Sequence, residues 1–192
     1  TQCLAPNACA SFNLTAACPT RPECNPQNIT VTICYQCAVT HLEIEYKIIS
    51  IRGYVKGCAC ANIVFNSVIS YLAEHVYEFC GIIPCSQGTR KFKIYYPVCA
   101  DLWIKGPPED YEYFFVRNAN CDVFCYYEYE WCWDEIIGKT RLQRISEAIP
   151  TNIINCNYVD PPDYDPNFPD QWRRVQCQLI ASPCNEGEGW EP

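Results

Sequence analysis

The chain has 192 residues, 49% of them hydrophobic and 14% aromatic, and this composition excludes a protein that is disordered throughout. Its formal net charge of −8 argues against nucleic-acid binding and against electrostatic adsorption to anionic membranes. No apolar run reaches the roughly 18 residues of a membrane-spanning helix, so we expect no membrane span.

Cysteine content is the strongest compositional signal. Seventeen cysteines beside only two histidines indicate a disulfide scaffold made in an oxidising compartment, so we expect an extracellular or cell-surface protein. Because 17 is odd, at least one cysteine should be free or bonded to another chain. Sequence does not determine the pairing, so all of them are disulfide candidates: Cys3, Cys9, Cys18, Cys24, Cys34, Cys37, Cys58, Cys60, Cys80, Cys85, Cys99, Cys121, Cys125, Cys132, Cys156, Cys177 and Cys184.

Residues 1–28 are rich in Cys, Pro and Asn and sustain neither a helical nor a strand period, which predicts an irregular N-terminal arm. Two roles are open for it: a segment clipped to the body by disulfides, or an extended arm that docks on a neighbouring subunit. Two N-glycosylation sequons lie in the arm or next to it, so glycans are candidate partners. Their acceptor residues are Asn13 and Asn28.

The remainder, 29–192, reads as a single β-rich domain. Residues 29–39 and 41–55 are β-branched and aromatic, which predicts two strands. In the second strand the alternation slips at Ile48 and Ile49, and a β-bulge would explain the slip.

Residues 61–79 have a different period, because their apolar side chains recur every three or four positions. This predicts one amphipathic helix, which Gly81 and Pro84 are suited to end. The apolar face is Phe65, Val68, Ile69, Leu72, Val76 and Phe79, and the polar face is Asn66, Ser70, Glu74 and Glu78. We therefore expect a β-rich α+β fold, with this helix covering one face of a disulfide-stapled antiparallel sheet or sandwich.

Strand period resumes over 89–104, where Pro97 predicts an edge strand or a bend. Another aromatic strand is expected over 111–116. The stretch 121–146 then predicts a β-hairpin that turns at Gly138. Its packed face should hold Tyr127, Tyr129, Trp131 and Trp133, and the opposite face Tyr126, Glu128, Glu130 and Cys132. We expect Cys121, Cys125 and Cys132 to staple the hairpin to the strands around Cys99 and Cys156.

The C-terminal part predicts a short strand within 150–158, an acidic Pro-rich linker over 159–171 and a final strand over 172–182. In the linker, oxygen atoms of Asp163, Asp165 and Asn167 have the spacing that opens a calcium loop. The glycine and the closing glutamate of such a loop are missing, so a solvated linker is the preferred interpretation and no metal is expected.

Cys34 and Cys37 have CxxC spacing but lie inside a predicted strand rather than at the start of a helix, which favours structural disulfides over a redox site. They should face opposite sides of that strand and so cannot pair with each other. A zinc tetrad with Cys58 and Cys60 can be drawn but conflicts with an oxidising compartment.

Catalytic sets are poorly supported. The only histidines are His41 and His75, no GxSxG motif accompanies them, and a histidine on a packed face is usually structural. Glu128 and Glu130 share a strand face, as solvated carboxylates commonly do. We expect neither an enzyme nor a cofactor.

Aromatic residues of the predicted strands have two interpretations. They form either a sheet core with a subunit interface, which we prefer, or a sugar-binding face. The set is Tyr111, Tyr113, Tyr126, Tyr127, Tyr129, Trp131 and Trp133.

A recognisable pattern extends over roughly 61–147. It consists of an amphipathic helix, a cysteine loop, an aromatic strand ending in cysteine and a C-x3-C segment before a hairpin. This pattern resembles a group of cysteine-rich secreted proteins of Bacteroidota. The residues that carry the resemblance are Phe92–Cys99, Cys121, Asp122, Cys125, Tyr129, Cys132 and Asp134. It implies an extracellular, non-enzymatic role as a surface or fibre component, and it transfers neither a disulfide pairing nor a catalytic residue.

Together these patterns predict a structural subunit of an extracellular helical, pilus-like filament. Its main partner is the chain itself, through the arm or the strand 29–39, which would add to the sheet edge of a neighbouring subunit. The alternative is a monomeric secreted binding module, adhesin-like or lectin-like.

Overall fold

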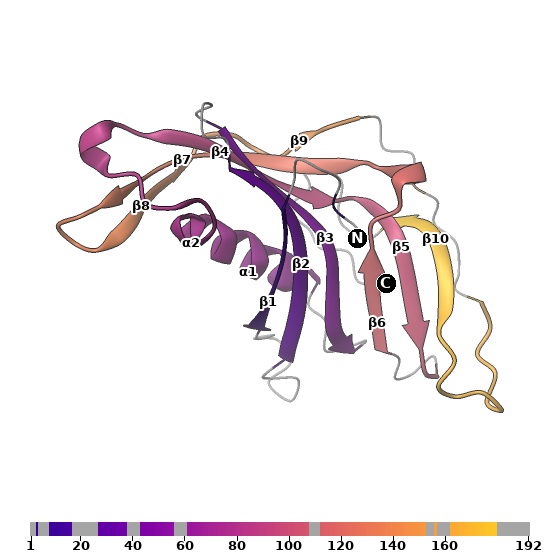
Figure 1. Cartoon of the computed structure of the whole chain (residues 1–192). Helices are drawn as coiled ribbons and strands as arrows, with labels where there is room; N and C mark the ends of the chain where they lie inside the picture. The colour runs from indigo at the N-terminus through magenta and orange to yellow at the C-terminus, as the bar shows by residue number, and fades with distance from the viewer. Residues whose placement is uncertain are drawn as a thin grey trace.

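The structure is a computed structural model that describes residues 3, 8–16, 27–37, 43–55, 61–107, 112–152, 156 and 162–179. A ten-stranded, largely antiparallel sheet dominates it, with helices on one face (Figure 1). The predicted β-rich α+β class is therefore confirmed, with one connected sheet rather than a sandwich. No helix in the described ranges is long and apolar enough to cross a membrane.

The elements follow the predicted order. Strands are β1 (Ala8–Ala16), β2 (Gln27–Cys37), β3 (Glu43–Val55), β4 (Arg90–Pro97), β5 (Cys99–Lys105), β6 (Glu112–Val116), β7 (Phe124–Asp134), β8 (Lys139–Arg144), β9 (Ile149–Pro150) and β10 (Arg173–Leu179). Helices are α1 (Ala61–Glu74), α2 (Val76–Cys80) and two 3-10 turns, η2 (Cys85–Gln87) and η3 (Ala119–Cys121).

Strand β3 is the point at which the sheet forks. Along one edge β3 pairs with β2, which in turn pairs with β1. Along its other edge the first half of β3 pairs in parallel with β4, whereas the second half pairs antiparallel with β6. One branch continues through β4 to β7 and β8, and the other through β6 to β5 and β10. In Figure 1 these branches extend to the left and to the right of the molecule.

The predicted β-bulge lies at the fork. In the β2–β3 ladder Thr32 is opposite Ser50, but Ile33 is opposite Ile48, so β3 holds one extra residue there. The buried positions of β3 accordingly change parity, from Tyr46 and Ile48 to Ile51. The bulge therefore bends the strand where its partner changes while keeping its apolar side chains in the core.

The core lies between the sheet and the helices. The helix contributes Val68, Leu72 and Val76, all fully buried, while every predicted polar-face residue is exposed. The Tyr46 side chain reaches from β3 to donate a hydrogen bond to the Val76 carbonyl oxygen (3.4 Å). Amphipathicity is thus confirmed, although the helix breaks at His75 into α1 and α2, and α2 ends at Gly81 with φ of +82°.

The predicted hairpin is confirmed as β7–β8. Asp134 pairs with Lys139 across the turn, and Gly138 has φ of +64°. Tyr129 and Trp131 are buried and Tyr127 and Trp133 half-buried, so the predicted aromatic face does pack. Cys132, expected on the outer face, is also buried, because a disulfide covers it.

Three expectations need correction. The arm is not irregular throughout, because residues 8–16 form β1 against β2, and the alternation of apolar and polar residues over Phe12–Thr15 is the strand signal that the sequence analysis missed. The strand expected over 89–104 divides around Val98, where the chain leaves one branch of the sheet for the other, so the bend at Pro97 is confirmed. Strand β4 is not an edge strand, but its ladder with β3 ends at Tyr95, so Pro97 itself pairs with β7 alone. Within 150–158 the described strand is only the end of the two-residue β9.

The rest of the C-terminal prediction holds in the described range. Residues 162–172 form turns and irregular structure, as a linker should, and β10 begins at Arg173. Together with β5, β10 ends the right-hand branch of the sheet.

Candidate functional site

The described sheet has three long strands that pair on one side only: β1, β8 and β10. Such edges present unpaired backbone N–H and C=O groups and can add a strand from another chain. Charged side chains usually protect edges from this. Edge strands that carry charged side chains are called guarded here, and edge strands without them are called open.

Strands β8 and β10 are guarded and β1 is not. Lys139, Arg141 and Arg144 lie in the six residues of β8, and Arg173 and Arg174 begin β10. All nine residues of β1, ACASFNLTA, are uncharged. We call the side of β1 that faces away from β2 the open edge. Within the described part of the chain, it is the long uncharged edge of the sheet.

The two faces of β1 differ in chemistry. Ala10, Phe12 and Leu14 are half-buried and pack on the core, and the Phe12 ring stacks on Tyr71 of α1 at 4.8 Å. The other face is exposed and carries Ser11, Asn13 and Thr15, each hydrogen-bonded to the opposite residue of β2. The inner face thus anchors β1 to its own chain, while no strand of the described ranges pairs with its outer edge.

Both sequons belong to this outer face. Asn13 is opposite Thr30, and Thr15 is opposite Asn28, so the acceptor of each sequon pairs with the threonine of the other. Asn13 and Asn28 are exposed. The sequence alone does not predict that the two sequons lie side by side, because their contact depends on strand β1, which was not predicted.

A cavity of about 550 Å³ lies between the helices and the β7–β8 hairpin. Its aromatic wall is formed by Tyr77 and Trp133, whose ring centroids are 4.7 Å apart. Glu74, His75 and Lys139 supply polar and charged groups to the lining. The cavity is therefore amphipathic, with convergent hydrogen-bonding groups beside an aromatic surface.

Local structure fixes the cavity walls. His75 stacks on Tyr71 at 4.2 Å between ring centroids, and its Nδ1 lies 2.9 Å from the Tyr71 carbonyl oxygen. The Thr140 hydroxyl donates to the Glu74 carbonyl oxygen (3.1 Å) and thereby ties β8 to the end of α1. Trp133 is held by its backbone N–H, which donates to the Ile83 carbonyl oxygen (2.8 Å). His75 is thus partly structural, as the sequence suggested.

Disulfides bring together segments that are distant in the sequence. The structure links Cys37–Cys80, Cys85–Cys132, Cys99–Cys156 and Cys121–Cys177. The expected attachment of the hairpin to Cys99 and Cys156 is wrong, because those two cysteines pair with each other. Cys132 instead joins β7 to η2, and Cys121 joins η3 to β10.

The CxxC prediction is confirmed. Cys37 bonds to Cys80 at the end of α2, and Cys34 lies with Cys3, so the two cysteines do not pair with each other. Cys125 is also disulfide-bonded. Five disulfide candidates lie outside the described residues: Cys18, Cys24, Cys58, Cys60 and Cys184. Two of them, Cys58 and Cys60, are half of the possible zinc tetrad.

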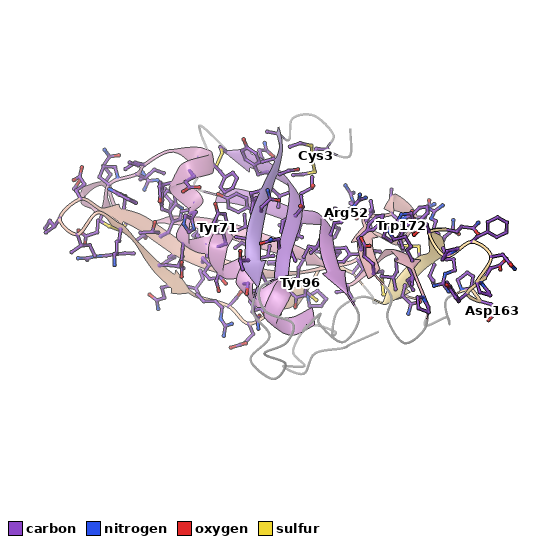
Figure 2. All side chains as sticks on the ribbon, turned by 90° about the horizontal axis from the view of Figure 1, so that it is seen from below. Cys3, Arg52, Tyr71, Tyr96, Asp163 and Trp172 are labelled. Atoms are coloured by element: carbon purple, nitrogen blue, oxygen red, sulfur yellow. A yellow bond between two sulfur atoms is a disulfide. The ribbon has the colours of Figure 1, made fainter. Side chains whose placement is uncertain are left out.

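The remaining predicted sites do not form a reaction centre among the described residues. Asp165 accepts hydrogen bonds from the backbone N–H and the side-chain amide of Asn167, both at 2.9 Å, in a turn that also contains the exposed Asp163 (Figure 2). Glu128 forms a 3.8 Å ion pair with Lys93, as a solvated face would. His41 lies outside the described residues.

Sequence reasoning missed a row of two aromatic rings flanked by two arginines on the outer face of the right-hand branch. Arg174 of β10, Trp103 of β5, Phe114 of β6 and Arg52 of β3 follow one another across four strands. Arg174 lies 5.7 Å from the Trp103 ring centroid and Arg52 lies 4.0 Å from that of Phe114. Figure 2 shows Arg52 near Trp172, whose ring meets Phe114 edge-on. Only the strand register reveals this row.

Asp101 is the buried anion that supports this region. It accepts hydrogen bonds from the Arg174 Nε (2.9 Å), the Asn118 amide (2.9 Å) and the backbone N–H of Cys177 (3.2 Å). Cys177 has φ of +49° at the bulge in β10, a conformation that needs such support. Asp101 is thus a structural residue rather than a catalytic one.

Comparison of the chain with known protein families, curated proteins and solved structures gives no match.

Proposed function

We propose that this protein is a structural subunit of an extracellular, disulfide-braced assembly built from copies of itself through the open edge of β1. The observation that carries the proposal is the contrast between β1, which is uncharged over nine residues, and the basic strands β8 and β10. An uncharged, extended edge is the surface on which strand addition occurs.

Charge decides which edges can meet. Pairing β8 with another β8, or with β10, would place basic side chains opposite each other, which is unfavourable. The open edge can pair with either basic edge without repulsion. A contact between β1 of one copy and β8 of the next is head-to-tail, and repeated head-to-tail contacts that do not close give a filament.

The hairpin tip favours β8 as the second surface. Figure 1 shows the β7–β8 hairpin projecting beyond the helices. At its turn Ile136 is 94% exposed and Ile137 is 59% exposed. Apolar side chains exposed to this degree at a projecting tip are typical of a contact surface. In the proposed filament these two side chains pack beside the β1 strand of the neighbouring copy.

Disulfides and sequons fit an extracellular role. Disulfide-bonded cysteines occur from η2 to β10, which requires an oxidising environment during folding. In a host with N-glycosylation machinery, Asn13 and Asn28 would carry glycans on the exposed face of β1–β2. That face is perpendicular to the open edge, so the backbone groups of the edge would stay accessible.

Two variants separate the possible assemblies by sedimentation velocity. Ser11→Lys places a charge on the open edge, and Ile136→Asp places one on the hairpin tip. A head-to-tail filament is weakened by both, whereas a closed β1–β1 dimer is weakened by Ser11→Lys alone. Gln36→Lys is the control, because it adds the same charge to an exposed position of β2 that pairs with β3 and lies beyond the last residue pair of the β1–β2 ladder. A wild-type protein that stays monomeric at all concentrations contradicts the proposal.

A second candidate function rests on the cavity beside Trp133. The Tyr77–Trp133 wall with Glu74, His75 and Lys139 combines an aromatic platform with hydrogen-bonding groups, as carbohydrate sites do. A lectin-like monomer would bind through this cavity. Trp131 has no exposed surface and cannot contact a ligand, so only Trp133→Ala tests the idea. Glycan-array binding that Trp133→Ala abolishes and Trp172→Ala preserves would favour this alternative.

A further inference from the structure

The arginine–aromatic row of the right-hand branch, made of Arg174, Trp103, Phe114 and Arg52, offers a partner positive charge rather than free ring faces. The Trp103 and Phe114 rings stack 8° from parallel, with their centroids 6.1 Å apart. The Arg174 guanidinium covers Trp103 and the Arg52 guanidinium covers Phe114. Guanidinium groups and ring edges therefore remain for a partner, and both are electrostatically positive. Such a surface favours a partner that carries carboxylates.

Arg52 is the cation of this row that lacks an acidic neighbour. At the other end of the row, Arg174 forms an ion pair with the buried Asp101. Lys105, also on β5, forms one with Glu112 at 3.2 Å. Among the described residues no carboxylate forms an ion pair with Arg52, which is exposed on β3. In a chain of net charge −8, this arginine is free to meet a carboxylate from another molecule.

The loop 162–172, which leads into β10, carries the complementary chemistry. Asp163, Asp165 and Asp170 are exposed in it, and the Phe168 side chain is 62% exposed. Asp165 is used within the loop as a hydrogen-bond acceptor. Neither Asp163 nor Asp170 forms an ion pair with another described residue. An exposed phenyl ring among unpaired carboxylates complements a row of aromatic and arginine side chains, the residue types enriched in protein interfaces.

Within one chain the loop extends away from the row. Trp172 anchors the base of the loop beside the row, since its ring meets Phe114 edge-on at 4.9 Å between centroids. Figure 2 shows Asp163 beyond β10, on the side of that strand away from Arg52. The row and the loop are thus two neighbouring surfaces that extend from β10 in opposite directions. A two-fold axis beside β10 would therefore place the tip of each loop at the Arg52 end of the opposite row.

We propose that the loop 162–172 docks on the arginine–aromatic row of a second copy, and that the contact is reciprocal. Asp163 of each chain then faces Arg52 of the other, and Phe168 packs against the ring edges of the row. Such a two-fold contact closes on itself and gives a dimer rather than a polymer. It uses neither β1 nor the hairpin tip, so it goes beyond the proposed filament and would join two filaments side by side.

Charge reversal on either surface tests the contact. Every protein in the experiment carries Ser11→Lys, which blocks assembly through β1, and its mass is measured by sedimentation equilibrium. We expect the Ser11→Lys protein to form dimers that dissociate at high salt. Adding Arg52→Glu or Asp163→Lys should raise the dimer dissociation constant at least about a hundredfold, because each substitution brings like charges together at both equivalent contacts.

Mixing the two charge-reversed variants is the decisive step. An equimolar mixture of Arg52→Glu chains and Asp163→Lys chains should form dimers again, because each of the two contacts then joins opposite charges. A chain that carries both substitutions should dimerise as well. The control is Lys91→Glu, which makes the same charge change at an exposed position of β4 on the other branch and should leave the dissociation constant unchanged. Circular dichroism of each variant reports whether it remains folded.

The outcomes separate this dimer from the filament. A Ser11→Lys protein that is monomeric at every concentration, or dimers that Arg52→Glu does not weaken, overturn the reciprocal contact and leave the filament proposal standing. Dimers restored in the doubly substituted chain but not in the mixture also overturn it, as do polymers larger than a dimer in the mixture. Conversely, wild-type protein that associates only as far as a dimer contradicts the filament and not this contact.

Discussion

Thr30 donates a 2.8 Å hydrogen bond from its hydroxyl to the Asn13 amide oxygen, across the pair of strands that forms the open edge. A coupling of about 0.5–1 kcal/mol is expected for such an exposed cross-strand pair. The double-mutant cycle of Asn13→Ala and Thr30→Val in urea unfolding measures it. Strictly additive effects of the two substitutions would show that the hydrogen bond does not hold β1 on β2.

Asp101 should be the most sensitive charged residue of the right-hand branch. Asp101→Ala leaves the Arg174 guanidinium and the Cys177 N–H without their acceptor, and we expect a loss of about 3 kcal/mol in the free energy of unfolding. The control is Asp122→Ala, which removes a more exposed carboxylate from its pair with Arg117 and should cost about 1 kcal/mol or less. Equal losses in the two variants would contradict this role for Asp101.

The hairpin turn should weaken in acid. Burial alone would raise the Asp134 pKa, but the N–H groups of Ile137 and Ile136 and the Arg141 guanidinium outweigh burial and lower it below 3.8. When the folded-state pKa of a carboxyl group is lower than its unfolded-state pKa, the ionised group stabilises the protein at pH values above the unfolded-state pKa. That stabilisation is lost as the pH falls through the folded-state pKa. Wild-type stability should therefore fall more steeply below about pH 4 than that of Asp134→Asn. Parallel curves would refute this.

Alkaline titration reports on the aromatic face. Burial, with a smaller contribution from Tyr127, raises the Tyr129 pKa to about 12, although Arg144 opposes the shift. Burial likewise raises the pKa values of Tyr46 and Tyr96. A tyrosine whose pKa is raised in the folded state contributes its full stabilisation at pH values below the unfolded-state pKa, which is near 10. That stabilisation is lost as the pH rises through the folded-state pKa. Tyrosinate absorbance should thus show that some tyrosines of the folded protein ionise only well above pH 10, and Tyr129→Phe should reduce the absorbance change of that part of the titration. A single transition near pH 10 in the folded protein would contradict this.

Much of the fold was predictable because several segments carry strong local periods. The helix face around Leu72, the hairpin turn at Gly138 and the bulge beside Ile48 all follow from side-chain spacing. Strand β1 was missed because its alternation of apolar and polar residues is clear only over Phe12–Thr15, within a segment rich in Cys, Pro and Asn. Its pairing with β2 supports this short alternation over nine residues.

The candidate sites were less predictable because they depend on register and on chain crossings. Asn13 meets Thr30, and Trp103 meets Arg174, only through strand pairing. The cavity joins Tyr77 to Trp133, residues from a helix and a hairpin that the sequence leaves unrelated. Disulfide partners such as Cys121 and Cys177 are separated by 56 residues, and cysteine spacing alone does not encode such pairs.

The most direct test of the assembly claim is hydrogen–deuterium exchange over residues 8–16, compared between concentrated wild-type protein and the Ser11→Lys variant. Our account predicts that the outward amides of β1 become protected at high concentration in wild type and remain exchangeable in the variant, while β4 is equally protected in both. Exchange of β1 that is the same at every concentration would contradict the account.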